Sequence, residues 1–278
     1  MNTDSNHELL ERSKGGDIDA FQTLFAEFQN QLKSYLYRLT TDRNDAEDFT
    51  HDTFIKAFNK LSTFRGESTL KTWVFQIATN LAYNSLAHKK RWSVNVTEEA
   101  KKLVMSTKSL SDSIVSVHNH SPQAIFEIKE HIDTCFTCVS KNLPIEKQVA
   151  LLLKDVYDFS IKEISMILKR PEGSVKYLIS EGRATLTDVF DSRCALVNKQ
   201  GVCHQCSELN GWFNPKQDQQ EALNAIEMKR DSGKYNRNEL YNLRAKLVKA
   251  IDPLRSKGNE LQDILMKCNR MAMGEVSL

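Results

Sequence analysis

One stretch, between Asp45 and Arg91, constrains the fold of this chain more than any other. Its first half, DAEDFTHDTFIKAF, spaces apolar residues as a helix does and sets Asp45, Asp48 and Asp52 together on another face. After a break at NKLSTFRGEST, its second half, LKTWVFQIATNLAYNSLAHKKR, predicts another helix with a cationic end. This combination is typical of a chain that contacts a basic protein surface on one side and nucleic acid on the other.

The second helix of this stretch has two predicted faces. We expect its apolar face to be buried, and it consists of Leu70, Trp73, Val74, Ile77 and Leu81. We expect its polar face to point away from the core, and it carries Thr72, Gln76, Asn80 and Tyr83. A preceding segment, residues 17–40, has the same periodicity, and Asp17 or Asp19 can cap its first amides. Three such helices packed together predict an all-helical first domain.

Length and charge limit what the chain can be. At 278 residues it has room for about two small domains and an extra segment. Its net charge of +2 is too small to indicate nucleic-acid binding by itself, so any DNA-binding charge has to be local. No apolar run is long enough to cross a bilayer, and the polar N-terminus lacks a signal-peptide core. We therefore expect a cytoplasmic protein without membrane contact, whose six cysteines stay reduced.

A second helical domain is predicted from Ser121 onward, with Ser121 as its cap and Pro122 as its first helical residue. It ends in FSIKEISMILKRPEGSVKYLISEGRATL, where Ser160 and Glu163 form a capping box and Ser174 is expected to cap the last helix. A capped helix, a short turn and a second helix with a polar face predict a helix-turn-helix, although helical hairpins share this pattern. Its candidate DNA-binding residues are Ser174, Lys176, Tyr177, Ser180 and Arg183.

Between the two domains, residues 93–121 are rich in serine, threonine and asparagine. They predict a mobile linker with a short helix around 98–104. His118 and His120 lie in this linker and are expected to be solvated rather than metal ligands.

The loop before the second helix of the first domain, with that helix, contains the residue types that opened DNA requires. An unstacked base needs aromatic or polar partners, and the phosphates need cations. Trp73 is of a suitable type but lies on the apolar stripe, so we expect it in the core. The candidate DNA-binding residues here are Phe64, Arg65, Asn80, Lys89, Lys90 and Arg91.

Both domains resemble parts of one known family. The run DAED-x-x-H-D-x-F, followed by F-R-G-E-S-T-L-K-T-W, resembles region 2 of bacterial RNA polymerase sigma factors of the sigma-70 family. Residues 143–186 resemble region 4 of the same family. The small extracytoplasmic-function type, which keeps only regions 2 and 4, is the most similar. The resemblance covers about residues 17–190 and does not extend to the rest of the chain.

The resemblance implies an all-α fold with region 2 in 1–92, a linker in 93–120, the helix-turn-helix region 4 in 121–190 and a C-terminal extension in 191–278. It implies a promoter-specificity subunit that binds core RNA polymerase, recognises the −35 and −10 elements of promoter DNA and initiates transcription. An anti-sigma factor is a further possible partner. We expect no enzymatic activity, because the sequence has no nucleophile–base set, phosphate loop or carboxylate pair. The expected polymerase-binding residues are Asp45, Glu47, Asp48 and Asp52.

The cysteines are not part of this resemblance. Two C-x-x-C pairs, 135–138 and 203–206, supply enough thiolates for a tetrahedral zinc site, so we expect Zn²⁺ as a structural or sensing cofactor on Cys135, Cys138, Cys203 and Cys206. His131 and Cys194 are substitute ligands. The alternative, equally open, is that Cys135 is a buried thiol on an apolar stripe and that no metal binds.

The C-terminal extension predicts helices at 221–230, at 237–251 and around Leu261, Ile264 and Leu265. These helices are too small to bury both faces alone, so we expect them to pack on the second domain or on a partner. Two other functions remain open at this point: a stand-alone helix-turn-helix regulator with metal- or redox-sensing cysteines, and a metal-sensing interaction protein that acts through this extension.

Overall fold

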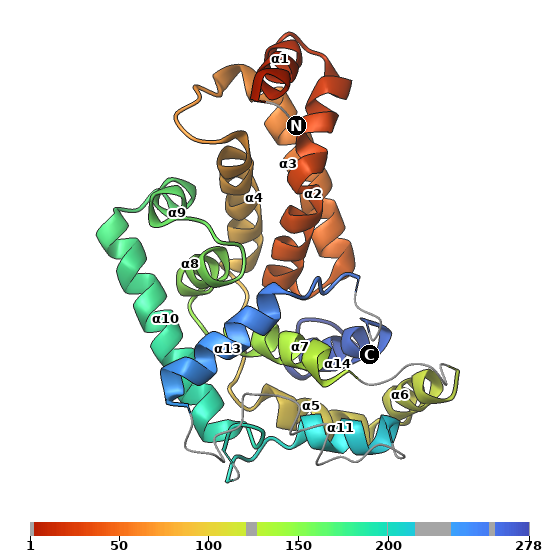
Figure 1. Ribbon diagram of the computed structural model, residues 1–278. Coiled ribbons are helices and arrows are strands. Elements are labelled where there is room, and N and C mark those ends of the chain that lie inside the picture. The colour runs from red at the N-terminus through yellow and green to blue at the C-terminus, as the bar shows by residue number, and fades with distance from the viewer. Residues whose placement is uncertain (1–2, 121–126, 199, 215–234, 256–258, 278) are drawn as a thin grey trace.

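The predicted all-helical fold is confirmed in a computed structural model that describes residues 3–120, 127–198, 200–214, 235–255 and 259–277 (Figure 1). The first bundle consists of α1 (Thr3–Lys14), α2 (Ile18–Thr40), α3 (Arg43–Asn59) and α4 (Leu70–Leu86), with a 3₁₀ turn at Leu61–Thr63. The second bundle consists of α7 (Ile128–Ser140), α8 (Ile145–Asp155), α9 (Ile161–Leu168) and α10 (Glu172–Arg193). No helix in the described residues is long and apolar enough to span a membrane.

Local capping chemistry fixes the helix ends in the first bundle. Asp17 accepts a hydrogen bond from the Ala20 amide at 3.0 Å, which starts α2. Thr41 ends α2 with a left-handed φ of 61°, and the next residue, Asp42, caps α3 through the Asn44 and Asp45 amides. Phenylalanines from α2 and α3 then interlock in the core at ring-centroid distances of 5.1 to 6.0 Å: Phe21, Phe25, Phe54 and Phe58.

The helix-turn-helix of the second bundle forms largely as predicted. Ser160 and Glu163 make the capping box at the start of α9. Lys169, with a left-handed φ of 52°, ends this helix. The following helix, α10, differs from the prediction because its cap is Pro171 and not Ser174, so it begins at Glu172. Proline fixes its own φ near the helical value, so the chain turns into the helix three residues earlier. The predicted cap at Ser121 and Pro122 lies outside the described residues.

The segment predicted as a mobile linker is mostly helical. It forms α5 (Val96–Ser106) and α6 (Lys108–His120). The C-terminal extension, residues 191–278, explains the difference, because its last helix, α14 (Asn259–Ala272), packs along both linker helices. Apolar side chains from α5, α6 and α14 form one cluster, which includes Ala100, Leu110 and Met271. His118 stacks against Trp212 with ring centroids 5.2 Å apart, so it is not a freely solvated residue.

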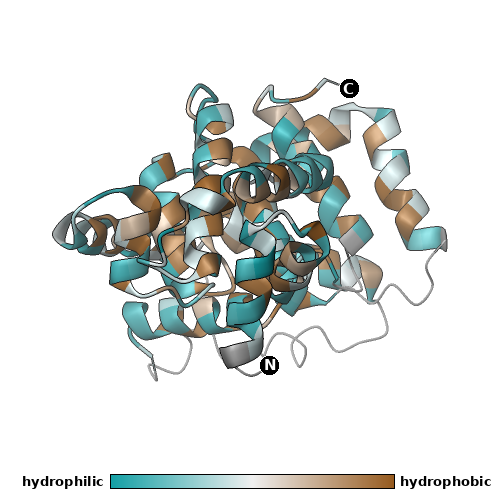
Figure 2. Cartoon of the chain, turned by 90° about the horizontal axis from the view of Figure 1, so that it is seen from above, coloured by the Kyte–Doolittle hydropathy of each residue, from teal (hydrophilic) through white to brown (hydrophobic). Residues whose placement is uncertain are grey.

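The C-terminal extension also contains α11 (Gln205–Phe213) and α13 (Arg237–Lys249). α11 is not predicted from the sequence, and the predicted helix at 221–230 lies outside the described residues. α13 crosses α7 and α10 and joins the apolar core that runs through both bundles (Figure 1). Most helices carry both hydrophobic and hydrophilic residues along their length, as expected for helices that bury one face (Figure 2). The two predicted domains therefore share one core in this arrangement.

Candidate nucleic-acid interface

The acidic face of α3 is open to solvent. Glu47, Asp48 and Asp52 are exposed and Asp45 is half-buried. Glu47 forms an ion pair with Lys33, whereas Asp48 and Asp52 have no ion pair among the described residues. Ile55 continues the same face one turn beyond Asp52 and is 42% exposed. We call Asp48, Asp52 and Ile55 the α3 face.

The predicted DNA-binding residues of the first bundle fall into two groups. Arg65, Asn80 and Lys90 are exposed, and Lys89 is half-buried. Phe64, in contrast, is buried and packs on Trp73 with ring centroids 5.3 Å apart, so in this arrangement it is a core residue that no base can reach. Arg91 donates a hydrogen bond to Gln148, and burial lowers the pKa of its guanidinium to about 10.

The prediction for the faces of α4 is wrong in part. Trp73, Ile77 and Leu81 are only half-buried, while Thr72, on the face expected to be open, is fully buried. The cause is α9, which lies along this face (Figure 1). The Thr72 hydroxyl donates to Glu163 at 3.0 Å, and the Gln76 amide donates to a backbone carbonyl of α9. α4 is therefore buried on two sides.

The second helix of the helix-turn-helix presents one continuous polar face. Ser174, Lys176, Tyr177 and Ser180 are exposed along α10, and Tyr177 is 62% exposed. Arg183, one turn further on, is held in place by Asp155 of α8, with Nε 2.9 Å from Oδ2. Both Arg183 and Lys176 line an open groove of about 520 Å³ between α10 and α13.

Asp155 and Tyr241 are residues of this surface that the sequence analysis missed. The Tyr241 hydroxyl, from α13, donates to the Asp155 oxygen that also receives Arg183, at 2.8 Å. The sequence gives no indication that Asp155, at the end of α8, pairs with Arg183, which lies 28 residues further along the chain. Only the fold identifies this pair.

The four predicted cysteines and Cys194 come together at one cavity. Cys135 of α7 and Cys194, Cys203 and Cys206 of the extension line one small cavity of about 50 Å³. The backbones of Cys194 and Cys203 lie side by side in a parallel bridge. Cys138 also reaches this cavity, but it is buried against Trp92 and Met266 and accepts a hydrogen bond from Asn269 at 3.5 Å. In the described part of the chain, no three His, Cys, Asp or Glu side chains form a group that could hold a metal ion.

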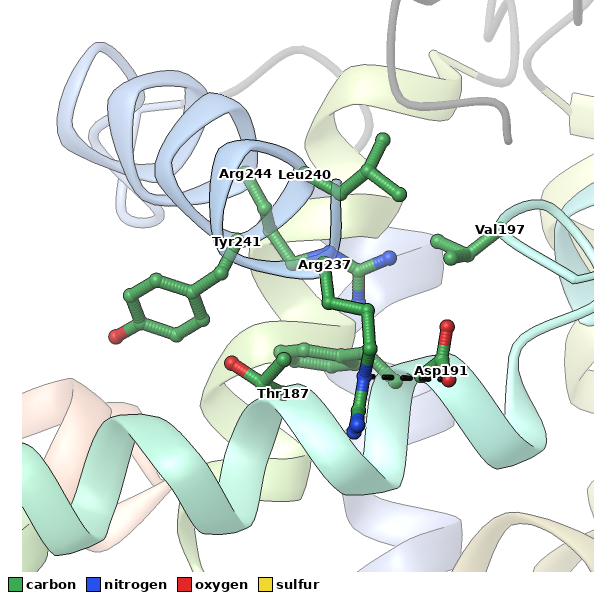
Figure 3. Close-up of a pocket in the computed structure, with 8 residues that line it drawn as sticks. Thr187, Asp191, Val197, Arg237, Leu240, Tyr241 and Arg244 are labelled. Atoms are coloured by element: carbon green, nitrogen blue, oxygen red, sulfur yellow. Dashed lines mark ion pairs between the residues drawn. The ribbon is translucent and has the colours of Figure 1, made fainter. Parts of the chain in front are cut away.

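A buried cation lies beside these thiols. Arg244 of α13 is 2% exposed, stacks over the Phe190 ring at 3.6 Å and donates to Cys194 Sγ at 3.6 Å. Among the described residues no carboxylate pairs with it. Figure 3 shows the contact between α13 and α10. Arg244 and Arg237 of α13 lie against α10 there, and Arg237 pairs with Asp191 at 3.3 Å.

Comparison with known proteins identifies the family. Residues 24–92 match sigma-70 region 2, and residues 134–186 match sigma-70 region 4. The chain is also 30% identical over 182 residues to the ECF RNA polymerase sigma-E factor of Haemophilus influenzae; the match covers 64% of this chain and 92% of the relative. The chain belongs to the sigma-70 family, extracytoplasmic-function type.

Other relatives agree. This sigma factor is 27% identical over 188 residues to the RNA polymerase sigma-H factor of Pseudomonas aeruginosa, across 67% of this chain and 94% of the relative. Among solved structures it is similar to CnrH in complex with the cytosolic domain of CnrY, with 17% identity, a TM-score of 0.48, and coverage of 67% of this chain and 97% of that one. The first bundle is thus region 2 and the second is region 4, and the chain is a promoter-specificity subunit of RNA polymerase. A stand-alone helix-turn-helix regulator is not favoured, because region 2 is also matched.

Proposed function

We propose that this sigma factor binds core RNA polymerase through the α3 face and reads the −35 element with the exposed face of α10. The observation that carries the proposal is that both surfaces are exposed, on separate helices, in regions assigned to one family. The −10 element would then meet the loop before α4 and the end of that helix, where Arg65, Asn80 and Lys90 are exposed. The subunit would act in the cytoplasm and leave catalysis to the polymerase. An anti-sigma factor that blocks it would have to cover one of these surfaces.

The α10 proposal is tested by Lys176→Ala. This substitution removes a single phosphate or guanine contact from region 4. It should weaken recognition of the upstream element without affecting region 2. We expect transcription from a cognate promoter by reconstituted polymerase to fall about tenfold, which corresponds to one good base or phosphate contact. Promoters selected from a random library with the native chain supply the template.

Lys162→Ala is the matched control, because Lys162 is an α9 residue outside the exposed face of α10. It should transcribe like the native chain, and both variants should bind core polymerase normally. If Lys176→Ala transcribes normally from every selected promoter, α10 does not read the upstream element through this residue.

We also propose that Cys135, Cys194, Cys203 and Cys206 hold one Zn²⁺ ion, with Cys194 in the place first assigned to Cys138. Charge supports this set, because a tetrathiolate zinc site carries two negative charges and Arg244 is a buried cation without a carboxylate partner in the described part. The thiols line the cavity without forming a ligand group as they stand, so they would have to turn toward it. Zinc would supply a structural link between α7 and the extension.

Metal content decides this proposal. Protein purified without chelator should contain about one zinc per chain, and Cys194→Ser should lose it while Cys138→Ser keeps it. Titration should find the four ligand thiols protected until the chain is denatured. Zinc-free native protein whose thiols all react before denaturation would contradict the site.

A further inference from the structure

Region 4 covers part of the DNA-binding helix of region 2. Besides the Thr72–Glu163 and Gln76 hydrogen bonds, Phe75 of α4 packs on Phe159, just before α9, with ring centroids 4.8 Å apart. This contact combines apolar packing with hydrogen bonds, as a specific interface does. A strand of opened DNA cannot reach Thr72 or Gln76 while α9 is in place.

The C-terminal extension ties the two regions together at a buried junction. Arg38 of α2, only 1% exposed, forms an ion pair with Asp133 of region 4 at 2.7 Å. The same guanidinium donates to the backbone carbonyls of Val248 and Ile251 in the extension, at 3.2 and 2.9 Å. One side chain of region 2 thus holds region 4 and the extension at once. Ser34 adds a hydrogen bond to Asp252 of the extension at 2.6 Å.

A second set of contacts surrounds this junction. Asp263 and Arg270 of α14 pair with Arg43 and Asp42 at the start of α3. On the region 4 side, Lys249 pairs with Asp158, and Tyr241 bonds to Asp155. The extension therefore contacts both DNA-binding regions by charged groups and not only by apolar packing.

Promoter geometry is incompatible with this closed arrangement. The −10 and −35 elements lie roughly 25 base pairs apart, which is about 85 Å of duplex at ~3.4 Å per base pair. A compact chain of this length is only about 50 Å across. Region 4 and region 2 therefore cannot occupy both elements until they separate. The α3 face, in contrast, is open in the closed chain.

We infer that the C-terminal extension is an intramolecular inhibitor, which holds region 4 against region 2 and keeps the side of α4 that carries Thr72 and Gln76 covered until the chain opens. The closed chain can dock on polymerase through the α3 face before it can hold promoter DNA. Opening has to break the junction at Arg38 together with the pairs made by α14. This inference goes beyond the proposed function, which assigns the surfaces but not their control.

Charge reversal at the ion pair between Arg43 and Asp263 tests the inference. Asp263→Arg places a like charge against Arg43 at a half-buried site. We expect a larger radius of gyration in solution scattering. We also expect about tenfold tighter binding to labelled random-sequence single-stranded DNA of about 12 nucleotides, because the side of α4 that carries Thr72 and Gln76 becomes accessible beside the residues that are already exposed. The double variant Arg43→Asp with Asp263→Arg restores an ion pair with reversed polarity, and both measurements should return toward the native values.

Glu208→Arg is the matched control, since Glu208 is an extension carboxylate whose one ion pair among the described residues is with Lys101 of the linker helix α5. It should change neither measurement. Deletion of residues 236–278 is the second variant, and a folded truncated chain should bind single-stranded DNA at least as well as Asp263→Arg does. Expansion of Asp263→Arg without tighter DNA binding, or no expansion in either variant, would overturn the inference. Failure of every chain to bind core polymerase would instead contradict the proposed function.

Discussion

Reversing the charges of Asp48 and Asp52 together is expected to abolish association with core RNA polymerase while the chain stays folded. Both carboxylates are exposed and belong to the open α3 face beside Ile55. A binding surface that faces a basic partner loses its attraction and gains repulsion when two charges are reversed. We expect Asp48→Lys with Asp52→Lys to weaken binding about 100-fold or more, as the loss of two contacts at the centre of an interface does. Co-purification with tagged core polymerase and a titration at moderate salt measure it.

The control has to change the total charge equally at another place. Glu99→Lys with Asp112→Lys does so on the linker helices, where both residues are exposed. It should bind polymerase like the native chain. Urea unfolding should show that neither double variant loses more than about 1 kcal/mol, since surface substitutions seldom do. If the variant with Asp48→Lys and Asp52→Lys binds polymerase normally, α3 is not the helix that docks on polymerase.

Features that depend on neighbours in the sequence could be predicted from it. The capping box at Ser160 and Glu163 and the Asp17 cap involve residues three apart, so the amino-acid pattern contains all the chemistry that forms them. Helix existence in both bundles followed from the 3.6-residue period for the same reason. The family assignment rested on two such stretches and is confirmed by the comparisons.

The faces of α4 show where this reasoning fails. Periodicity separates an apolar side from a polar one, but it cannot indicate that α9, some 90 residues away, covers the polar side. Thr72 can be buried because its hydroxyl donates a hydrogen bond to Glu163. In the sequence alone, such a buried threonine looks the same as an exposed one. The helical linker is a similar case, because α5 has its apolar partner in α14.

The surroundings of α7 separate three residues that the sequence offers as candidate metal ligands. His131, Cys135 and Cys138 all belong to α7, but they lie in three environments. His131 bonds to Gln262, Cys135 faces the other thiols, and Cys138 is buried against Trp92. A step of three residues leaves side chains about 60° apart on a helix, which is enough to separate them when the surroundings are densely packed. The C-x-x-C spacing by itself therefore does not show which thiols on a helix face one another.

Removal of the buried ion pair at the junction is the change expected to destabilise the fold most. Arg38→Met leaves Asp133 buried without its cation and deprives the carbonyls of Val248 and Ile251 of a donor. Breaking a buried pair by removing one partner costs about 3–5 kcal/mol. The free energy of unfolding of Arg38→Met, from urea denaturation at pH 7, should fall by that amount. Asp133→Leu added to it should recover much of the loss, because no charge is then left uncompensated.

The pH dependence of this loss separates an electrostatic cause from a packing defect. Burial raises the pKa of Asp133, and removal of Arg38 raises it further, because the nearby positive charge that favours the carboxylate is gone. A carboxyl whose folded pKa lies above its unfolded value contributes stability that is present at low pH and lost as pH rises through the folded pKa. Arg38→Met should therefore be less destabilised at pH 5 than at pH 7, while the double variant should show no such difference. An equal loss at both pH values would mean that Arg38 stabilises the junction by packing and hydrogen bonds to the extension, not by compensating Asp133.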